Sequence, residues 1–251
     1  MGVESISWIG FGGFFIASLV VGVRLVALWH RNRELPELLI GVGVLGIGPV
    51  GFGFMTIASV LGEGHGLVSR ALLATGVLAA CVGAFAEIVF NTYVYHRGNR
   101  LVYGIAGISG VLLLLCFAGA GVQTGFASMN TVDGPYLGRT VITVACLFWG
   151  SVEALRYWRL MSRRSRLGLA DPVVTNRFLL WGLGAGAAGL GTTVGSVAQW
   201  WTGLPPLEIP FVTLSSSLHG SIAALAMWLA FLPPAAYLRR LTERSVRTST
   251  V

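Results

Sequence analysis

The sequence contains no lysine, so all 17 of its strongly basic residues are arginine. Without a lysine amine the chain cannot form a Schiff base with retinal, and we expect no cofactor. Only 11% of the 251 residues are charged, whereas 55% are hydrophobic and 35 are glycine. These proportions exclude an ordinary soluble domain and predict an all-α integral membrane protein.

Cysteine and histidine are also scarce. Cys81, Cys116 and Cys146 all lie within apolar segments and form no closely spaced pair, which predicts buried thiols without a disulfide or zinc framework. His219 alone among four histidines lies well inside an apolar segment, so neither a metal-dependent membrane hydrolase nor a bis-histidine haem site is expected. No GxSxG, HExxH or glycine-rich phosphate-binding motif occurs. We therefore expect no enzymatic activity and no metal site.

Apolar segments long enough to cross about 30 Å of hydrocarbon account for nearly the whole chain. There are seven, at about 5–29, 36–61, 69–95, 101–122, 139–161, 172–201 and 210–237, and a basic tail, 238–251, follows. We predict a single membrane domain over 1–251, folded as a seven-transmembrane-helix bundle.

Arginines are concentrated in alternate connections between these segments. Thirteen follow the first, third, fifth and seventh segments, whereas only Arg70 and Arg139 lie at the opposite ends. Because cytoplasmic connections carry the arginine excess in membrane proteins, we predict an external N-terminus and a cytoplasmic C-terminus. The predicted location is a multi-pass position in a bacterial-type inner or plasma membrane. The positive charge then faces anionic lipid headgroups, and no nucleic-acid partner is expected.

One polar group is expected in the cytoplasmic third of the bundle, by its depth along the spans at 1.5 Å per residue. Its members are Arg24, Glu87, Asn91, Glu153 and Arg156. Carboxylates at this depth are costly unless paired, and we expect Arg24 to neutralise Glu87 or Glu153. Two interpretations remain open, a switch or proton relay and a set of structural ion pairs that joins the first, third and fifth spans.

A second polar group is expected in the outer half of the last three spans. Its candidate ligand-binding residues are Trp149, Thr192, Ser196, Gln199, Thr213, Ser216 and His219. Hydrogen-bonding side chains beside aromatic walls suit a pocket for a small apolar or amphipathic ligand. The alternative is that the hydroxyls bond their own helices or join neighbouring helices.

Glycines recur at four-residue spacing on the sixth span. Gly182 with Gly186, and Gly191 with Gly195, form two GxxxG pairs, and the second span is nearly as rich in glycine. This spacing predicts close helix packing. Bent helices that open a cavity are the alternative.

The layout resembles two classes of seven-helix protein. It is similar to that of rhodopsins and G-protein-coupled receptors, and the PAAY sequence before Arg239 is similar to the proline-x-x-tyrosine ending of the last receptor helix. Tyr95-His96-Arg97 stands where receptors have an acidic-arginine motif. The layout also resembles that of sugar-transporting proteins built from two parallel three-helix repeats and one linker span, although their proline-glutamine signature is absent.

Three functions are compatible with these patterns. The one we favour from sequence is a receptor-like sensor that binds a small ligand in the outer group and signals to a cytoplasmic protein partner, which docks on Arg163, Arg164 and Arg166. The alternative is a small-solute or proton-coupled transporter in which Glu87 or Glu153 changes protonation. The second alternative is a membrane scaffold or assembly factor with purely structural polar residues. A homo-oligomer in the lipid bilayer is compatible with all three.

Overall fold

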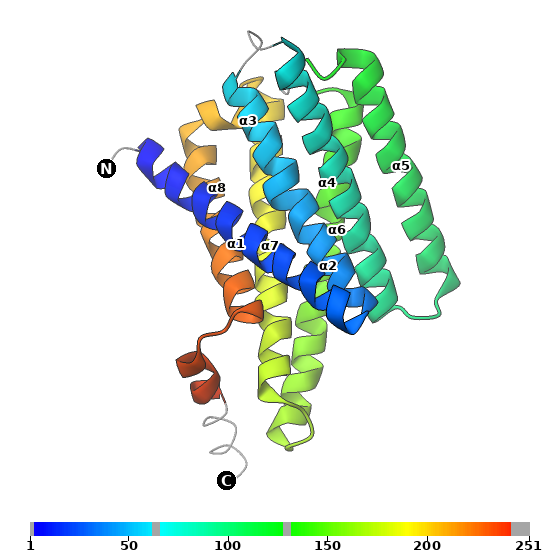
Figure 1. The fold of residues 1–251 in the computed structure, drawn as a ribbon, viewed down its shortest axis with the longest axis vertical. Coiled ribbons are helices and arrows are strands. Elements are labelled where there is room, and N and C mark those ends of the chain that lie inside the picture. Colours follow the sequence, from blue (N-terminus) through cyan, green and yellow to red (C-terminus); the bar gives the residue numbers. More distant parts are fainter. Residues whose placement is uncertain (1–2, 62–65, 128–131, 242–251) are drawn as a thin grey trace.

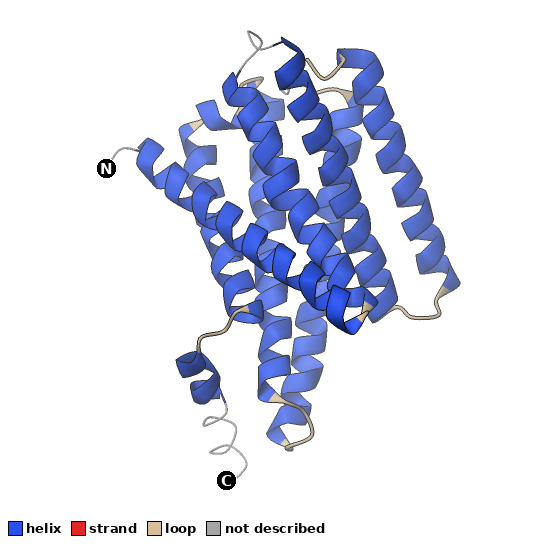
Figure 2. Ribbon diagram, in the orientation of Figure 1, coloured by secondary structure: helices blue, strands red, loops and turns tan. Residues whose placement is uncertain are grey.

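The computed structural model describes residues 3–61, 66–127 and 132–241. Over these ranges the chain forms helices and no strand, as Figure 2 shows. Seven helical segments within the same ranges are long and apolar enough to cross a membrane. The predicted all-helical fold with seven long apolar helices is therefore confirmed.

The helices run alternately up and down the molecule (Figure 1). Their bounds are α1 Val3–Asn32, α2 Leu35–Leu45, the π-helical segment η1 Gly46–Phe52, α3 Gly53–Leu61, α4 Gly66–Tyr95, α5 Arg100–Thr124, α6 Gly134–Arg166, α7 Pro172–Thr202, the 3-10 helix η3 Pro206–Glu208 and α8 Pro210–Phe231. The elements α2, η1 and α3 follow end to end and form the second span. The connections after α1, α4 and α6 all lie at the bottom of Figure 1, so the arginine-rich connections share one end of the bundle.

Short polar signals in the sequence set the helix ends. The side chains of Asn99, Asp133 and Asp171 accept a backbone N–H in the first turn of α5, α6 and α7, at 3.1, 2.8 and 2.8 Å. These are helix-capping bonds, which satisfy backbone donors that have no partner within the helix. Gly125 and Gly203 end α5 and α7 in the left-handed conformation that glycine adopts without strain.

Two helices differ from their predicted bounds by five residues or more at one end or both. Helix α6 begins at Gly134 instead of 139 because the Asp133 cap starts it earlier, and it continues to Arg166 instead of 161. Helix α8 ends at Phe231 instead of 237, because Pro233 and Pro234 interrupt it and a separate short helix covers 235–241. The first four residues of the predicted tail belong to this short helix, and 242–251 lie outside the described residues.

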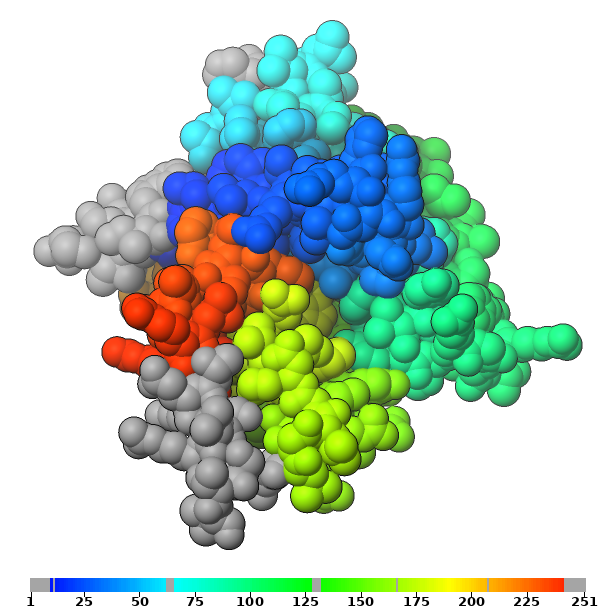
Figure 3. All heavy atoms as spheres, turned by 60° about the horizontal axis from the view of Figure 1, so that its bottom comes forward, coloured from blue at the N-terminus to red at the C-terminus, as the bar shows by residue number. Residues whose placement is uncertain are grey.

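Six spans close a ring, and α5 lies outside it. Along the described chain, α1 packs on α2 and α8, the second span on α4, α4 on α6, α6 on α7, and α7 on α8. Figure 3, which brings the arginine-rich end forward, shows α1, α8, α7 and the end of α4 next to one another around this face. Helix α5 packs on α4 and α6, and of its residues only Ala106 and Leu113 are buried.

Glycines bring the second span into backbone contact with α4. A Cβ atom added to Gly83 would lie 2.7 Å from the backbone nitrogen of Ile47, and one added to Gly46 would lie 2.6 Å from the carbonyl oxygen of Ala79. Neither position has room for a side chain. The glycine-rich sequence of the second span therefore serves close packing.

The GxxxG pairs of α7 face two different neighbours. A Cβ atom on Gly186 would lie 2.8 Å from Ser151 Oγ of α6, whereas one on Gly191 would lie 3.1 Å from His219 Cβ of α8. Ser151 Oγ also donates a hydrogen bond to the carbonyl of Gly182, at 2.7 Å. Helix α7 is thus held closely on both sides.

Candidate functional site

Glu87 lies on α4, in the wall that this helix shares with the second span. Only 6% of the residue is exposed. Gly43 of α2 faces it so closely that an added Cβ atom would lie 2.5 Å from Glu87 Oε1. Among the described residues, none forms an ion pair or hydrogen bond with this carboxylate. When ionised it has no counter-ion, which makes its burial costly.

Asn91 lies one turn further along the same face of α4 and is fully buried. Its Nδ2 donates a hydrogen bond to the carbonyl oxygen of Cys146 on α6, at 3.3 Å. Its Oδ1 has no hydrogen-bond partner in the described part of the chain. Buried polar atoms without partners are rare in folded proteins. Glu87 and Asn91 therefore place unused acceptor atoms on one face of α4.

Glu153 of α6 is buried as well, but it is paired. Its Oε1 lies 3.1 Å from His96 Nε2, and its Oε2 lies 3.7 Å from Arg156 Nη1. His96 directly follows α4, so its contact joins the end of α4 to α6. The Arg156 side chain is 68% exposed, and solvent screens its share of the interaction.

Arg24 does not neutralise either carboxylate, and this prediction is wrong. The residue is exposed on α1, and the described structure has no ion pair between it and Glu87 or Glu153. Val21 and Leu25 take the inward-facing positions of the same helix and are buried. Arg24 precedes Leu25 by one residue, and this rotation of about 100° around the helix axis turns its side chain away from the bundle.

The outer hydroxyl groups bond mainly to their own helices. Thr192 Oγ1 donates to the carbonyl of Ala188 at 2.9 Å, and Thr213 Oγ1 donates to that of Ile209 at 3.1 Å. Ser216 is exposed. This pattern matches the alternative interpretation of these residues, in which the hydroxyl groups donate hydrogen bonds to carbonyl oxygens of their own helices.

His219 is likewise bound to its own helix. Its Nδ1 lies 2.7 Å from the carbonyl oxygen of Ser215, and its Cβ packs against Gly191 of α7. The ring therefore helps to join α7 and α8.

Ser196 and Gln199 do meet, through a residue that the sequence did not single out. Tyr136 of α6 donates its hydroxyl hydrogen bond to Gln199 Oε1 at 2.8 Å, and the hydroxyl lies 3.3 Å from Ser196 Oγ. Gln199 is 3% exposed. These contacts fix the start of α6 against the end of α7.

Trp149 lies away from this outer group. Its ring centroid is 5.6 Å from that of His96, beside the Glu153 pair. Helix α6 extends past α4 at the arginine-rich end (Figure 1), so a residue midway along α6 is level with the end of α4. The prediction that Trp149 borders an outer pocket is wrong, because α6 projects beyond α4 and its middle therefore lies beside the end of α4 at His96.

The predicted docking arginines lie on the projecting end of α6. Arg163 and Arg164 are exposed in its last turns. Arg166 is the last residue of the helix, and its side chain lies outside the described part of the structure.

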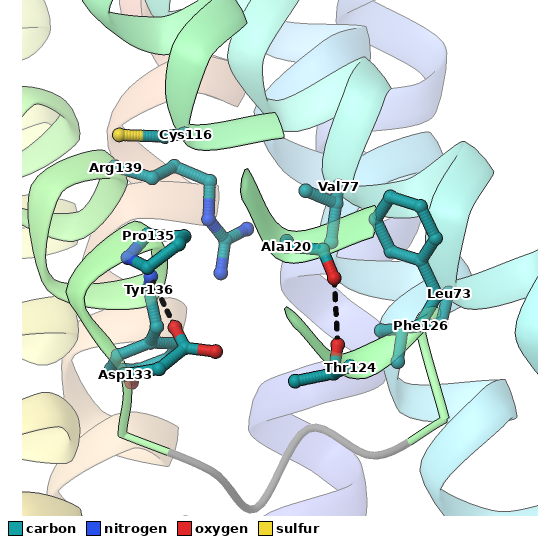
Figure 4. Close-up of a pocket in the computed structure, with 10 residues that line it drawn as sticks. All are labelled: Leu73, Val77, Cys116, Ala120, Thr124, Phe126, Asp133, Pro135, Tyr136 and Arg139. Carbon is teal, nitrogen blue, oxygen red and sulfur yellow. Dashed lines mark hydrogen bonds between the residues drawn. The ribbon is translucent and has the colours of Figure 1, made fainter. Parts of the chain in front are cut away.

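A cavity of about 40 Å³ lies between α4, α5 and the start of α6. Arg139, Asp133, Tyr136 and Cys116 are among its lining residues, and the Arg139 guanidinium group points into it (Figure 4). The sequence contained one signal for this place. Of the 17 arginines, 13 belong to the arginine-rich connections and the tail, and two belong to the predicted cytoplasmic polar group. Arg139 is one of the two that remain, and Arg70 is the other.

Seven of the fifteen predicted site residues thus fall into three groups, which are Glu87 with Asn91, Glu153 with Arg156 and Trp149, and Ser196 with Gln199. No family model, curated protein or solved structure matches the chain. The chemistry of these groups is therefore the ground on which a function can be proposed.

Proposed function

We propose that this protein is a multi-pass membrane carrier that couples the movement of a small solute to a proton, with Glu87 as the proton-binding group. The observation that carries the proposal is the Glu87 carboxylate, which is buried between two spans without a counter-ion. Ionisable residues at such positions mark ion pathways and proton relays in membrane proteins. A carboxyl group held without a partner can bind or release a proton without breaking an existing ion pair.

The distribution of arginine supports the membrane orientation that the carrier requires. All arginine-rich connections lie at one end of the bundle (Figure 1). We propose that this end faces the cytoplasm and that the N-terminus is external. Glu87 then lies about 12 Å along α4 from its cytoplasmic end at Tyr95.

Polar residues form a series along α4 between this end and Glu87. The His96 side chain is 25% exposed and contacts buried Glu153, whereas Asn91 lies deeper with an unpaired Oδ1. Asn91 and Glu87 share one helix face. This series supports a proton path to Glu87 from the cytoplasmic side.

The arrangement of the helices supports transport too. The first three spans pack consecutively, as do α6, α7 and α8, and the two groups meet through the α4–α6 and α1–α8 contacts. Helix α5 connects the groups from outside the ring. Carriers built from two parallel three-helix repeats and one linker span have this layout, and their two repeats move against each other. Asn91 lies at one of the two junctions, where its side chain bonds α6.

The receptor-like sensor has less support, because Thr192, Thr213 and His219 are bonded to their own helices. A ligand would have to compete with these hydrogen bonds. The measurement of solute binding in the test below distinguishes a sensor from a carrier.

The test is solute-driven proton movement in liposomes that contain this protein alone. A pH-sensitive dye is enclosed, and panels of sugars, amino acids and organic acids are added outside. We expect at least one solute to change the internal pH with the wild-type protein, and Glu87→Gln to abolish this change. Glu34→Gln is the matched control, because it makes the same chemical change at an exposed residue of the first connection.

Other outcomes separate the alternatives. Uptake of labelled solute without a pH change, equal in wild type and Glu87→Gln, would indicate a carrier that does not use Glu87. Binding of a panel solute by the folded protein without flux would favour the sensor. Neither binding nor flux with any solute of the panel would favour a scaffold and contradict the carrier.

A further inference from the structure

The cavity at the start of α6 combines an apolar wall with two charged groups. Leu73 and Val77 of α4 and Ala120 of α5 line one side, and Arg139 and Asp133 line the other (Figure 4). It lies at the end of the bundle away from the arginine-rich connections. It is independent of Glu87 and of the proposed proton path.

Arg139 points into this cavity without a strong acceptor. Its Nη1 donates a weak hydrogen bond to Met55 Sδ at 3.4 Å, and its guanidinium carbon lies 5.7 Å from the centroid of the Tyr136 ring. The described residues offer it no ion pair. A guanidinium group has five N–H donors, and thioether sulfur is a poor acceptor. Most of the hydrogen-bonding capacity of Arg139 is therefore available to a ligand.

Asp133 supplies the opposite charge in the same cavity. Its Oδ1 accepts the backbone N–H of Tyr136 at 2.8 Å as the cap of α6, and its second carboxylate oxygen projects to the cavity side of this bond (Figure 4). Asp133 and Arg139 line one cavity yet form no ion pair with each other in the described structure. Two opposite charges are thus held apart across a shared space.

This separation selects for a ligand with charges of both signs. A purely anionic group near Arg139 would be repelled by Asp133, and a purely cationic group near Asp133 would be repelled by Arg139. We propose that the cavity binds a small zwitterion, with its carboxylate or phosphate on Arg139 and its ammonium group on Asp133. The rings of Tyr136 and Phe126, which also line the cavity, provide faces that attract an ammonium group.

The size of the cavity limits the ligand. About 40 Å³ is enough for a few water-sized groups, and pockets for drug-sized ligands are roughly tenfold larger. A short zwitterionic unit fits this space. Two sources carry this chemistry, a free amino acid and the phosphoethanolamine headgroup of a membrane lipid.

The test measures binding to the purified full chain by native mass spectrometry with three probes. Alanine represents the free zwitterion, lysophosphatidylethanolamine the lipid headgroup, and lysophosphatidylglycerol the same phosphate without an ammonium group. We expect one of the two zwitterionic probes to bind about tenfold more tightly than lysophosphatidylglycerol, as the loss of one charged contact predicts. Which of the two binds identifies the source.

Matched variants assign the two charges. Arg139→Gln and Asp133→Asn are each expected to weaken the zwitterionic probe about tenfold. Asparagine caps helices as well as aspartate does, so Asp133→Asn keeps the start of α6 folded. Arg70→Gln, at an exposed arginine of the same end, and Asp171→Asn, at the cap of α7, are the controls and are expected to bind as the wild type does.

Thiol labelling of the wild-type protein provides a second readout that needs no variant. Cys116 lines the cavity and is partly exposed, whereas Cys81 and Cys146 are buried. The bound zwitterion is expected to slow the maleimide reaction of Cys116 in proportion to its occupancy. Equal binding of all three probes, unchanged binding by Asp133→Asn, or no binding and no protection with either zwitterion would overturn the proposal.

Discussion

Glu87 and Glu153 are two carboxylates at the same end of one bundle that are buried to a similar extent but differ in their charged partners. Glu153 contacts His96 and Arg156 and lies beside the exposed end of α4. Glu87 lies deeper, against the backbone of Gly43, with no ion pair in the described structure. The first arrangement joins helices, whereas the second leaves a charge-bearing group free to change state. The presence or absence of a charged partner thus distinguishes the acid that joins two helices from the one that we propose binds a proton.

The largest effect is expected where the close packing beside Glu87 is disturbed. Gly83→Ala would place a Cβ atom 2.7 Å from a backbone nitrogen and 2.9 Å from a backbone carbon of the second span, neither of which can rotate away. We expect a loss of about 1–3 kcal/mol in unfolding free energy, as for other overpacked interiors. Thermal unfolding of the protein in detergent measures this loss. Gly104→Ala is the control, because nothing lies within 4 Å of a Cβ atom there, and equal melting temperatures for the two variants would contradict the close contact.

A smaller loss is expected when the paired carboxylate is neutralised. Glu153→Gln removes the charge that holds His96 and Arg156 while keeping an acceptor for one hydrogen bond. We expect a decrease of about 1 kcal/mol in unfolding free energy. The measurement compares its melting temperature with that of Glu34→Gln, where the same change is made in solvent. Indistinguishable melting temperatures would show that the His96 contact does not stabilise the fold.

Glu87→Gln makes the same chemical change at the carboxylate that has no ion pair in the described structure. Its effect on stability is compared with that of Glu153→Gln. Glu87→Gln removes a buried charge that has no counter-ion to lose, so we expect the melting temperature to stay constant or to rise. This outcome together with loss of proton movement would separate function from stability. A decrease as large as that of Glu153→Gln would mean that Glu87 has a stabilising partner.

The smallest loss in unfolding free energy is expected at the exposed member of the paired group. Arg156→Ala removes an ion pair between residues three apart on α6, and such exposed pairs contribute about 0.3–0.5 kcal/mol. Raising the salt concentration should reduce even this difference between variant and wild type. A salt-independent loss would show that Arg156 acts through packing instead of charge.

Much of the fold could be predicted because hydrophobicity and arginine content depend on position along the chain. These two patterns identified seven apolar helices and placed their arginine-rich connections together at one end of the bundle. They could not determine helix rotation, which is why Arg24 was expected inside the bundle and lies outside. They also could not determine how far a helix projects, and Trp149 was therefore placed at the wrong depth.

The candidate site was predicted in part. Carboxyl and amide side chains inside apolar segments are rare enough that Glu87, Asn91 and Glu153 stood out, but their partners were not visible in the sequence. His96 follows a helix end and was assigned to a connection, although it folds back onto α6. Arg139 was counted only as a topology signal, since no linear pattern shows that Asp133 and Arg139 share a cavity.

The peripheral position of α5 has an evolutionary consequence. Its outer face meets no other helix in the described structure, so selection there acts on length and apolarity more than on shape. Exceptions are the few places where it meets its neighbours, such as Gly110, which lies against the Phe85 ring, and Cys116, which lies against Gly138. Homologous sequences should therefore diverge fastest along the rest of this helix. In a comparison of such sequences, the three spans before α5 and the three spans after it should be aligned separately.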